Sequence, residues 1–127
     1  MKNEAKVPLE AAVVEKITKA LKVAGVRYLF KMHGEGFQSS GIPDLIGIAP
    51  NGRFFALEVK RPVLGRVSPL QVKAINKINA AGGFAEVAWE PEQAVAYLEL
   101  AMEGKPYEVD WEVKPEWLMR EIRKLGS

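Results

Sequence analysis

The sequence has 127 residues and a formal net charge of +2, with 48% hydrophobic residues, 27% charged residues and no cysteine. These values predict one ordinary globular domain, and they exclude disulfide bonds and zinc sites built from thiolates. Because the N-terminal stretch has no apolar signal-peptide core and no run reaches the ~20 apolar residues of a membrane span, we expect an intracellular, cytoplasmic protein without a membrane partner.

The expected elements, in chain order, are a helix, three strands, a helix, a strand and a helix. Apolar residues at helical spacing indicate the helices, and short apolar runs indicate the strands. Ser68, followed by Pro69, predicts the cap of the second helix, and Asn51-Gly52 predicts a tight turn between two antiparallel strands. The expected ranges are 9–25, 26–33, 44–50, 53–60, 68–83, 84–89 and 91–102.

The two strands joined by this turn each carry a carboxylate, although apolar residues dominate both. Asp44 begins the first strand, and Glu58 lies near the end of the second, where Lys60 shares its face because strand side chains alternate. The hairpin can therefore bring Asp44 and Glu58 together. Glu-x-Lys triplets also occur in polar terminal or loop segments, so the place of this triplet at the end of an apolar strand is what makes it informative.

Two carboxylates held close together repel each other unless one takes up a proton or a cation lies between them. A hard divalent ion such as Mg²⁺ resolves this repulsion, because it binds one or two carboxylates and takes its other ligands from water and phosphate. Lys60 would then orient a water molecule or stabilise charge on a phosphate, which suits hydrolysis of a phosphodiester. The alternative is a plain ion pair between Glu58 and Lys60 at the end of the strand.

The first helix adds a further acid. On a helical wheel with about 100° per residue, Glu10 falls on the core-facing side and Glu15 on the opposite side. Glu10 can therefore reach over the sheet towards a metal ion, whereas Glu15 is an ordinary surface acid. The alternative for Glu10 is that the helix dipole alone favours an acid at the helix N-terminus.

These motifs, in this order, resemble the VRR-NUC domain of the PD-(D/E)XK nuclease superfamily. The resemblance covers about residues 7–100 and rests on the helix Glu, GIPDLIG, FFALEVKRP, GRVSPLQVKAINKINAAGG and FAEVAW. It implies a restriction-endonuclease-like α/β core, in which helices flank a mixed central sheet in the order α-β-β-β-α-β-α plus a C-terminal helix. It also implies that this domain hydrolyses DNA with Mg²⁺ or Mn²⁺.

We expect the nuclease domain to span residues 1–102 and a C-terminal extension to span residues 103–127. The extension ends in a short amphipathic helix carrying Trp117, Leu118 and Ile122. This helix is expected to pack on the core or at a dimer interface, and the resemblance assigns no role to it.

The resemblance implies roles for individual residues of the hairpin. Asp44 matches the metal-binding aspartate, and Glu58 matches the second acidic metal ligand. Val59, between Glu58 and Lys60, would offer its backbone carbonyl to the metal. Lys60 matches the catalytic lysine.

Residues outside the hairpin match as well. Glu10 matches the acid of the first helix, with Glu15 as the alternative candidate, and Gln71 matches a glutamine near the active centre. Small stand-alone members of the family, often from phages, resemble Holliday-junction resolvases in acting as dimers on branched DNA. The resemblance therefore implies a homodimer with a role in DNA repair, in the host cytoplasm if the protein is phage-encoded.

The net charge is too small to identify a nucleic-acid binder, but basic residues gather around the second motif strand. We expect Arg61, Arg66 and Lys73 to contact DNA phosphates, which would make binding sensitive to salt. His33 is a further candidate for DNA contact, from a loop rich in glycine and serine. For each of them the alternative is an ordinary solvated surface residue.

The leading hypothesis is a divalent-metal-dependent endonuclease that acts on branched or structured DNA. One alternative is a general nuclease for duplex or single-stranded DNA, and another is a non-catalytic nucleic-acid-binding module on the same fold. The complete set of Asp44, Glu58 and Lys60 favours an enzyme, whereas the preference for branched DNA comes from the resemblance alone.

Overall fold

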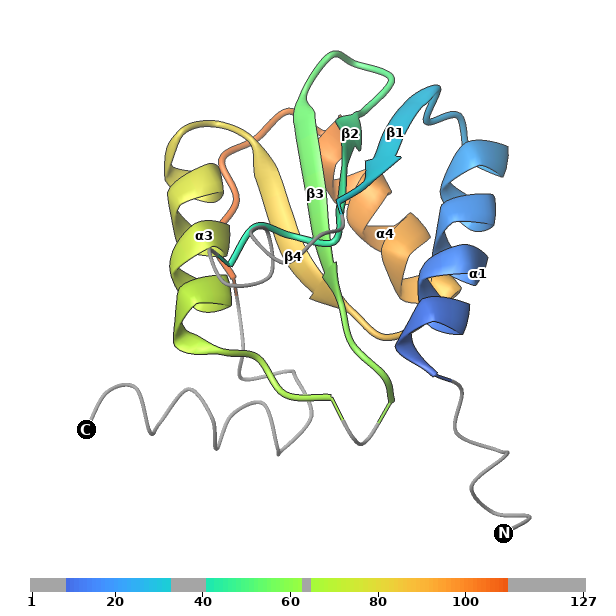
Figure 1. Ribbon diagram of the computed structural model, residues 1–127. Helices are drawn as coiled ribbons and strands as arrows, with labels where there is room; N and C mark the ends of the chain where they lie inside the picture. Colours follow the sequence, from blue (N-terminus) through green and yellow to red (C-terminus); the bar gives the residue numbers. More distant parts are fainter. Residues whose placement is uncertain (1–8, 33–40, 63–64, 110–127) are drawn as a thin grey trace, which may run out of the picture.

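The computed structural model describes residues 9–32, 41–62 and 65–109. It is an α/β structure in which helices flank a four-stranded mixed sheet (Figure 1). The order of the elements confirms the prediction. The elements are α1 (Glu10–Val23), β1 (Tyr28–Lys31), β2 (Leu45–Ile48), β3 (Phe54–Val59), α3 (Pro69–Ala80), β4 (Phe84–Ala88) and α4 (Pro91–Met102).

One predicted strand differs from the structure in its length, and two other predicted features lie outside the described residues. The expected strand over residues 26–33 is too long among the described residues, because β1 is limited to Tyr28–Lys31, the residues that pair with β2. His33 and the expected C-terminal helix with Trp117, Leu118 and Ile122 lie outside the described residues. None of the helices within the described ranges has the length and apolar character needed to span a bilayer.

The sheet has the strand order β1-β2-β3-β4, with antiparallel pairing from β1 to β3 and parallel pairing between β3 and β4. The predicted hairpin is confirmed: Ala49 N donates to Arg53 O at 2.8 Å across the turn. Gly52 adopts φ +90° there, a conformation that glycine reaches without steric cost. Leu45 faces Leu57 in this register, so Asp44 comes opposite Glu58 one step further along.

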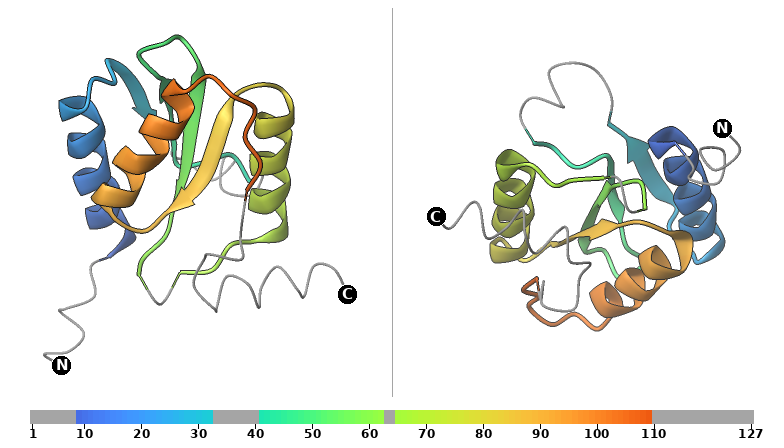
Figure 2. Two further views of the ribbon diagram at one scale, coloured as in Figure 1. Left: turned by 180° about the vertical axis from the view of Figure 1, so that it is seen from behind. Right: turned by 90° about the horizontal axis from the view of Figure 1, so that it is seen from below.

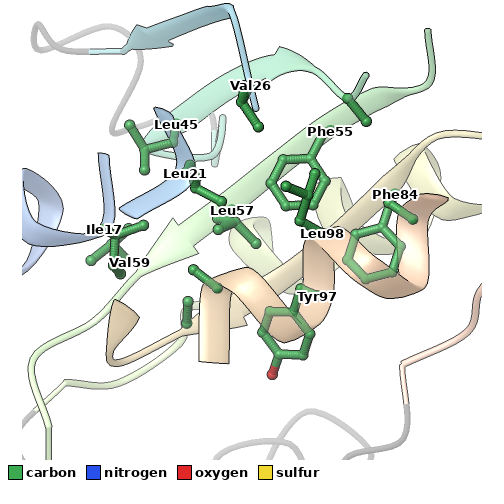
Figure 3. Close-up of a cluster of buried hydrophobic side chains, with 14 of the residues drawn as sticks. Ile17, Leu21, Val26, Leu45, Phe55, Leu57, Val59, Phe84, Tyr97 and Leu98 are labelled. Atoms are coloured by element: carbon green, nitrogen blue, oxygen red, sulfur yellow. The ribbon is translucent and has the colours of Figure 1, made fainter. Parts of the chain in front are cut away.

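Helices cover the two faces of the sheet unequally (Figure 2). On one face, α1 and α4 pack against each other and against β3, and they bury the larger apolar cluster (Figure 3). On the other face, α3 packs on β4 and buries a smaller cluster. Since side chains alternate along β3, Phe55, Leu57 and Val59 belong to the larger cluster, and Ala56 belongs to the smaller one.

The candidate site residues lie at one end of the sheet. β3 ends there, and α1 and α3 begin there, at the lower edge of Figure 1. The antiparallel pairing brings the start of β2 to the same place. The topology therefore gathers Asp44, Glu58, Glu10 and Gln71 from four separate elements.

At the opposite end of β3, Arg53 makes several contacts, and Asn51 Nδ2 also donates to Ala101 O at 3.2 Å. Arg53 donates from Nε to Gly82 O, from Nη2 to Gly83 O and from Nη1 to Ala101 O, each at 3.1 Å. Its guanidinium also lies 5.8 Å from the ring centre of Phe84. One residue therefore ties the β2–β3 turn to the start of β4 and to the C-terminal end of α4.

We predict that Arg53→Met lowers the free energy of unfolding by about 2 kcal/mol, because three carbonyls lose a charged donor. Arg53→Lys should lose about half of that, since an ammonium cannot reproduce the planar fork of the guanidinium. Unfolding in urea would measure both losses.

The control is Arg27→Met, which replaces an exposed arginine and should change the unfolding free energy by less than about 0.5 kcal/mol. Equal losses for Arg53→Met and Arg27→Met would contradict the prediction.

Candidate active site

Asp44 lies immediately before β2 and is fixed at both its backbone and its side chain. Its carbonyl oxygen accepts a hydrogen bond from Met32 N at 2.7 Å, which continues the pairing with β1. Its Oδ2 accepts from Val59 N at 2.8 Å, across to the end of β3. The carboxylate is therefore held beside Glu58 in the way that the hairpin predicts.

Glu58 is a buried carboxylate in the middle of an apolar strand, with only 2% of its surface exposed. Its Oε2 accepts from Gln71 Nε2 at 2.7 Å and lies 3.3 Å from Lys60 Nζ. Its Oε1 is buried and has no hydrogen-bond partner among the described residues. Burial and, after it, the charge of Asp44 raise the pKa of Glu58 to about 8, against the lowering effect of Lys60. A cation beside Oε1 would stabilise the charged form of Glu58 and so lower this pKa.

Lys60 follows the last residue of β3, but its backbone continues the sheet. Lys60 N donates to Ala88 O at 3.0 Å, and the side chain turns back to Glu58 on the same face. Gly65 lies against it: a Cβ on this glycine would come within 2.6 Å of the Lys60 Cβ. The chain therefore folds back over the lysine, and the ion pair considered from the sequence is present within a larger cluster.

The two candidate acids of α1 have different surroundings. Glu10 begins the helix and is half-buried; burial and then the charge of Asp44 raise its pKa, and Lys60 and Arg61 lower it. Glu15 is exposed and forms an ion pair with Lys31 at 2.7 Å. Both acids line a pocket of about 310 Å³ that reaches Asp44. The structure therefore places Glu10 with the strand carboxylates and Glu15 at the surface.

Gln71 connects the first turn of α3 to the carboxylates. Ser68 caps the helix by accepting from Gln71 N at 3.2 Å, and Gln71 Oε1 accepts from Ser68 N at 2.8 Å. These two bonds form a capping box, in which the side chain of the third helical residue reaches back to the cap. The far end of the same amide donates to Glu58.

The structure distributes the expected DNA-contacting residues unevenly. Arg61 is half-buried and close enough to lower the pKa of Glu10, so it belongs to the cluster. Arg66 is exposed in the segment that leads into α3. Lys73 is exposed two residues after Gln71, and at about 100° per residue it lies on a different side of α3. His33 lies outside the described residues.

The residues present fit a divalent cation that takes most of its ligands from water and substrate. In the part of the chain that the structure describes, no three His, Cys, Asp or Glu side chains converge closely enough to hold an ion by themselves. Mg²⁺ needs only one or two carboxylates, because it keeps water or phosphate at its other positions. The partnerless Oε1 of Glu58 and the adjacent Asp44 carboxylate would be such ligands. The Val59 carbonyl and Glu10 are the further candidates.

Sequence reasoning missed one feature of this site. The Ser-x-x-Gln spacing of a capping box was available at Ser68 and Gln71 and would have predicted their pairing. Gly41 makes a close backbone approach near the site: its φ is +82°, and a Cβ there would lie 2.4 Å from Leu70 O. Gly41 therefore lets the loop before Asp44 run against the first turn of α3.

A second buried carboxylate was missed as well, on the opposite face of the sheet. Glu86 of β4 is fully buried, and its Oε1 accepts from Val87 N at 2.9 Å. Its Oε2 accepts from Tyr107 Oη at 2.6 Å. Burial and the charge of Glu86 raise the pKa of Tyr97. Glu86 thus ties the segment after α4 to the sheet, away from the candidate site.

Comparison with protein families gives one match. A family model described as the VRR-NUC domain matches residues 3–89. Every candidate site residue discussed above lies within this range. Comparisons with curated proteins and with solved structures found no match.

We predict that Gly41→Ala destabilises the protein more than Gly52→Ala does. Both positions have positive φ, so each alanine costs about 1–2 kcal/mol in backbone strain. Only at Gly41 does the new Cβ also meet backbone, which adds about 2 kcal/mol of overpacking. At Gly52 it has no neighbour within 4 Å. Unfolding free energies from denaturant titrations would show the difference, and equal values would mean that the loop yields freely.

Proposed function

Since this chain belongs to the VRR-NUC domain family, and so has a nuclease-type function on DNA, we propose that it is a divalent-metal-dependent DNA endonuclease. One observation carries the proposal. Two carboxylates lie side by side at the ends of paired strands, and within the described ranges one of them, Glu58, keeps a buried oxygen without a hydrogen-bond partner. An ion pair between Lys60 and Glu58 Oε2 alone would leave the buried Oε1 without a partner among the described residues.

The reaction is hydrolysis of a phosphodiester bond. The oxygen of a water molecule bonds to phosphorus, and the bond from phosphorus to the leaving oxygen breaks. The proton that the water gives up ends on the leaving oxygen, which becomes a hydroxyl group. When bound, Mg²⁺ or Mn²⁺ supplies positive charge at the phosphate and makes its bound water more acidic. Asp44 and Glu58 would hold the ion, and Glu10 and the Val59 carbonyl are the further candidates.

Lys60 and Gln71 act on this arrangement from the protein side. Lys60 places its positive charge 3.3 Å from Glu58 Oε2. It orients the attacking water or stabilises the negative charge that grows on the phosphate. Gln71 holds Glu58 in place through its amide.

The substrate we propose is branched or otherwise structured DNA, bound by a homodimer in the manner of a Holliday-junction resolvase. The family resemblance supports this substrate. Arg61 supplies a cationic side chain beside the candidate site, and Arg66 supplies one in the segment that leads into α3. A general nuclease for duplex or single-stranded DNA is the alternative. The relative cleavage rates of junction, flap, duplex and single-stranded DNA would distinguish these two functions. Sedimentation of the protein would give its oligomeric state.

We predict that Asp44→Asn and Glu58→Gln each abolish cleavage that requires Mg²⁺ or Mn²⁺, because each variant loses a charged metal ligand. DNA binding should persist or tighten, since negative charge is removed near the phosphates. Glu10→Gln should lower the rate, and the matched control Glu15→Gln should leave it unchanged. The measurement is cleavage of labelled DNA substrates with either metal or with EDTA.

Full activity of Asp44→Asn or Glu58→Gln would contradict the assignment of the metal ligands. Loss of activity in Glu15→Gln but not in Glu10→Gln would exchange the roles of the two helix acids. Binding without cleavage by the wild-type protein under all conditions would favour the non-catalytic alternative.

We also predict that Arg66→Ala weakens binding to all DNA sequences alike. If Arg66 neutralises one phosphate of a duplex, the slope of log K against log salt concentration should become shallower by about 0.9. Lys22→Ala is the control, because Lys22 is exposed in the last turn of α1, at the other end of the molecule. An unchanged slope for Arg66→Ala would place this residue away from the DNA.

A further inference from the structure

Both ends of the Gln71 side-chain amide form hydrogen bonds, one with a donor and the other with an acceptor. Gln71 Oε1 accepts from the backbone N–H of Ser68 at 2.8 Å. Gln71 Nε2 donates to Glu58 Oε2 at 2.7 Å. A backbone N–H can only donate, and Glu58 Oε2, which lies 3.3 Å from Lys60 Nζ, is an acceptor. Only one of the two orientations of the amide therefore satisfies both neighbours.

The flipped amide would make two unfavourable contacts. Its oxygen would face the carboxylate of Glu58, and its NH₂ group would face the N–H of Ser68. Glu58 is buried, so solvent cannot compensate for the lost donor. The backbone of the helix cap thus fixes which end of Gln71 reaches Glu58.

This orientation determines which oxygen of Glu58 stays available. Oε2 receives Gln71 and lies against Lys60, while Oε1 is buried without a hydrogen-bond partner in the described part of the chain. We propose that the cap of α3 is a positioning device for the metal centre: the Ser68 N–H orients the Gln71 amide, which in turn reserves Glu58 Oε1 for the cation. This inference rests on the proposed function and extends it to Ser68, which makes no contact with Glu58 itself.

The protein contains an internal comparison for this device. Gln93 in the first turn of α4 accepts a hydrogen bond from Trp89 N at 2.7 Å through its own Oε1. A glutamine that reaches back to the chain before its helix is thus a local feature of both helices. Of these two glutamines, Gln71 of α3 is the one whose amide nitrogen donates to a candidate metal ligand.

The test separates the N–H of Ser68 from its hydroxyl. Ser68→Ala keeps the N–H and loses the Oγ that caps the helix. Ser68→Pro also removes the N–H, and the backbone at this position, with φ −81° and ψ 161°, suits proline. Gln71→Met removes both ends of the amide, and Gln93→Met is the matched control on α4.

Two readouts need no catalysis. Calorimetric titration of the metal-free protein with MnCl₂ gives the dissociation constant for Mn²⁺. The nitrogen–proton spectrum of the Gln71 side chain, assigned by its loss in Gln71→Met, reports whether one amide proton is held by Glu58. Melting temperatures provide the correction for general destabilisation.

We expect Ser68→Pro and Gln71→Met to weaken Mn²⁺ binding by about tenfold or more, as is usual when a group that orients a metal ligand is lost. Ser68→Ala should lower the melting temperature, because the helix loses its cap. It should weaken Mn²⁺ binding less than Ser68→Pro does. Gln93→Met should lower the melting temperature without changing Mn²⁺ affinity. In the wild type, one amide proton of Gln71 should be shifted and protected from exchange with water.

Several results would overturn the inference. One is Mn²⁺ binding by Ser68→Pro as tight as that of the wild type; another is a loss of affinity in all variants, Gln93→Met included, in proportion to their melting temperatures. Should Ser68→Pro not fold, the wild-type spectrum decides, because amide protons that exchange as in a free glutamine would exclude the proposed orientation. Absence of Mn²⁺ binding by the wild type would overturn the metal centre itself, while a protected Gln71 amide would still show that the cap orients it.

Discussion

A buried carboxylate in an apolar strand is the constraint around which this structure is arranged. Removing the charge of Glu58 from water is costly, and the neighbouring charge of Asp44 increases the cost. Lys60 and Gln71 offset part of it, but both act on the same oxygen. A core built for stability alone would place an apolar residue here, as at all the remaining positions of β3. The arrangement makes chemical sense once a cation is added.

Three separate local structures hold the carboxylates in position. The tight turn at Asn51-Gly52 sets the register that brings Asp44 opposite Glu58. The close contact of Gly41 with Leu70 keeps the loop before Asp44 against α3. The cap of α3 orients the amide that reaches Glu58. The first two act through the backbone, and the third fixes a glutamine side chain through a backbone N–H.

The features that could be predicted from the sequence are those that depend on periodicity and turn chemistry. The hairpin, its antiparallel register and the pairing of Asp44 with Glu58 follow from alternation and one Asn-Gly turn. The ends of β1 could not be predicted, because a strand ends where its partner does. The bond from Gln71 to Glu58 and the bond from Glu86 to Tyr107 join separate elements through side chains, and no local pattern encodes such contacts. The assignment of roles to the site residues stays a prediction.

The site is compact along the chain as well as in space. The bonds from Val59 to Asp44 and from Gln71 to Glu58 span 15 and 13 residues, whereas the bond from Arg53 to Ala101 spans 48. Closing short loops costs less chain entropy, and local contacts favour fast folding. During synthesis, all the candidate ligands emerge from the ribosome before β4 and α4. The candidate site is thus synthesised first, and the strand and helix that complete the core of the protein arrive last.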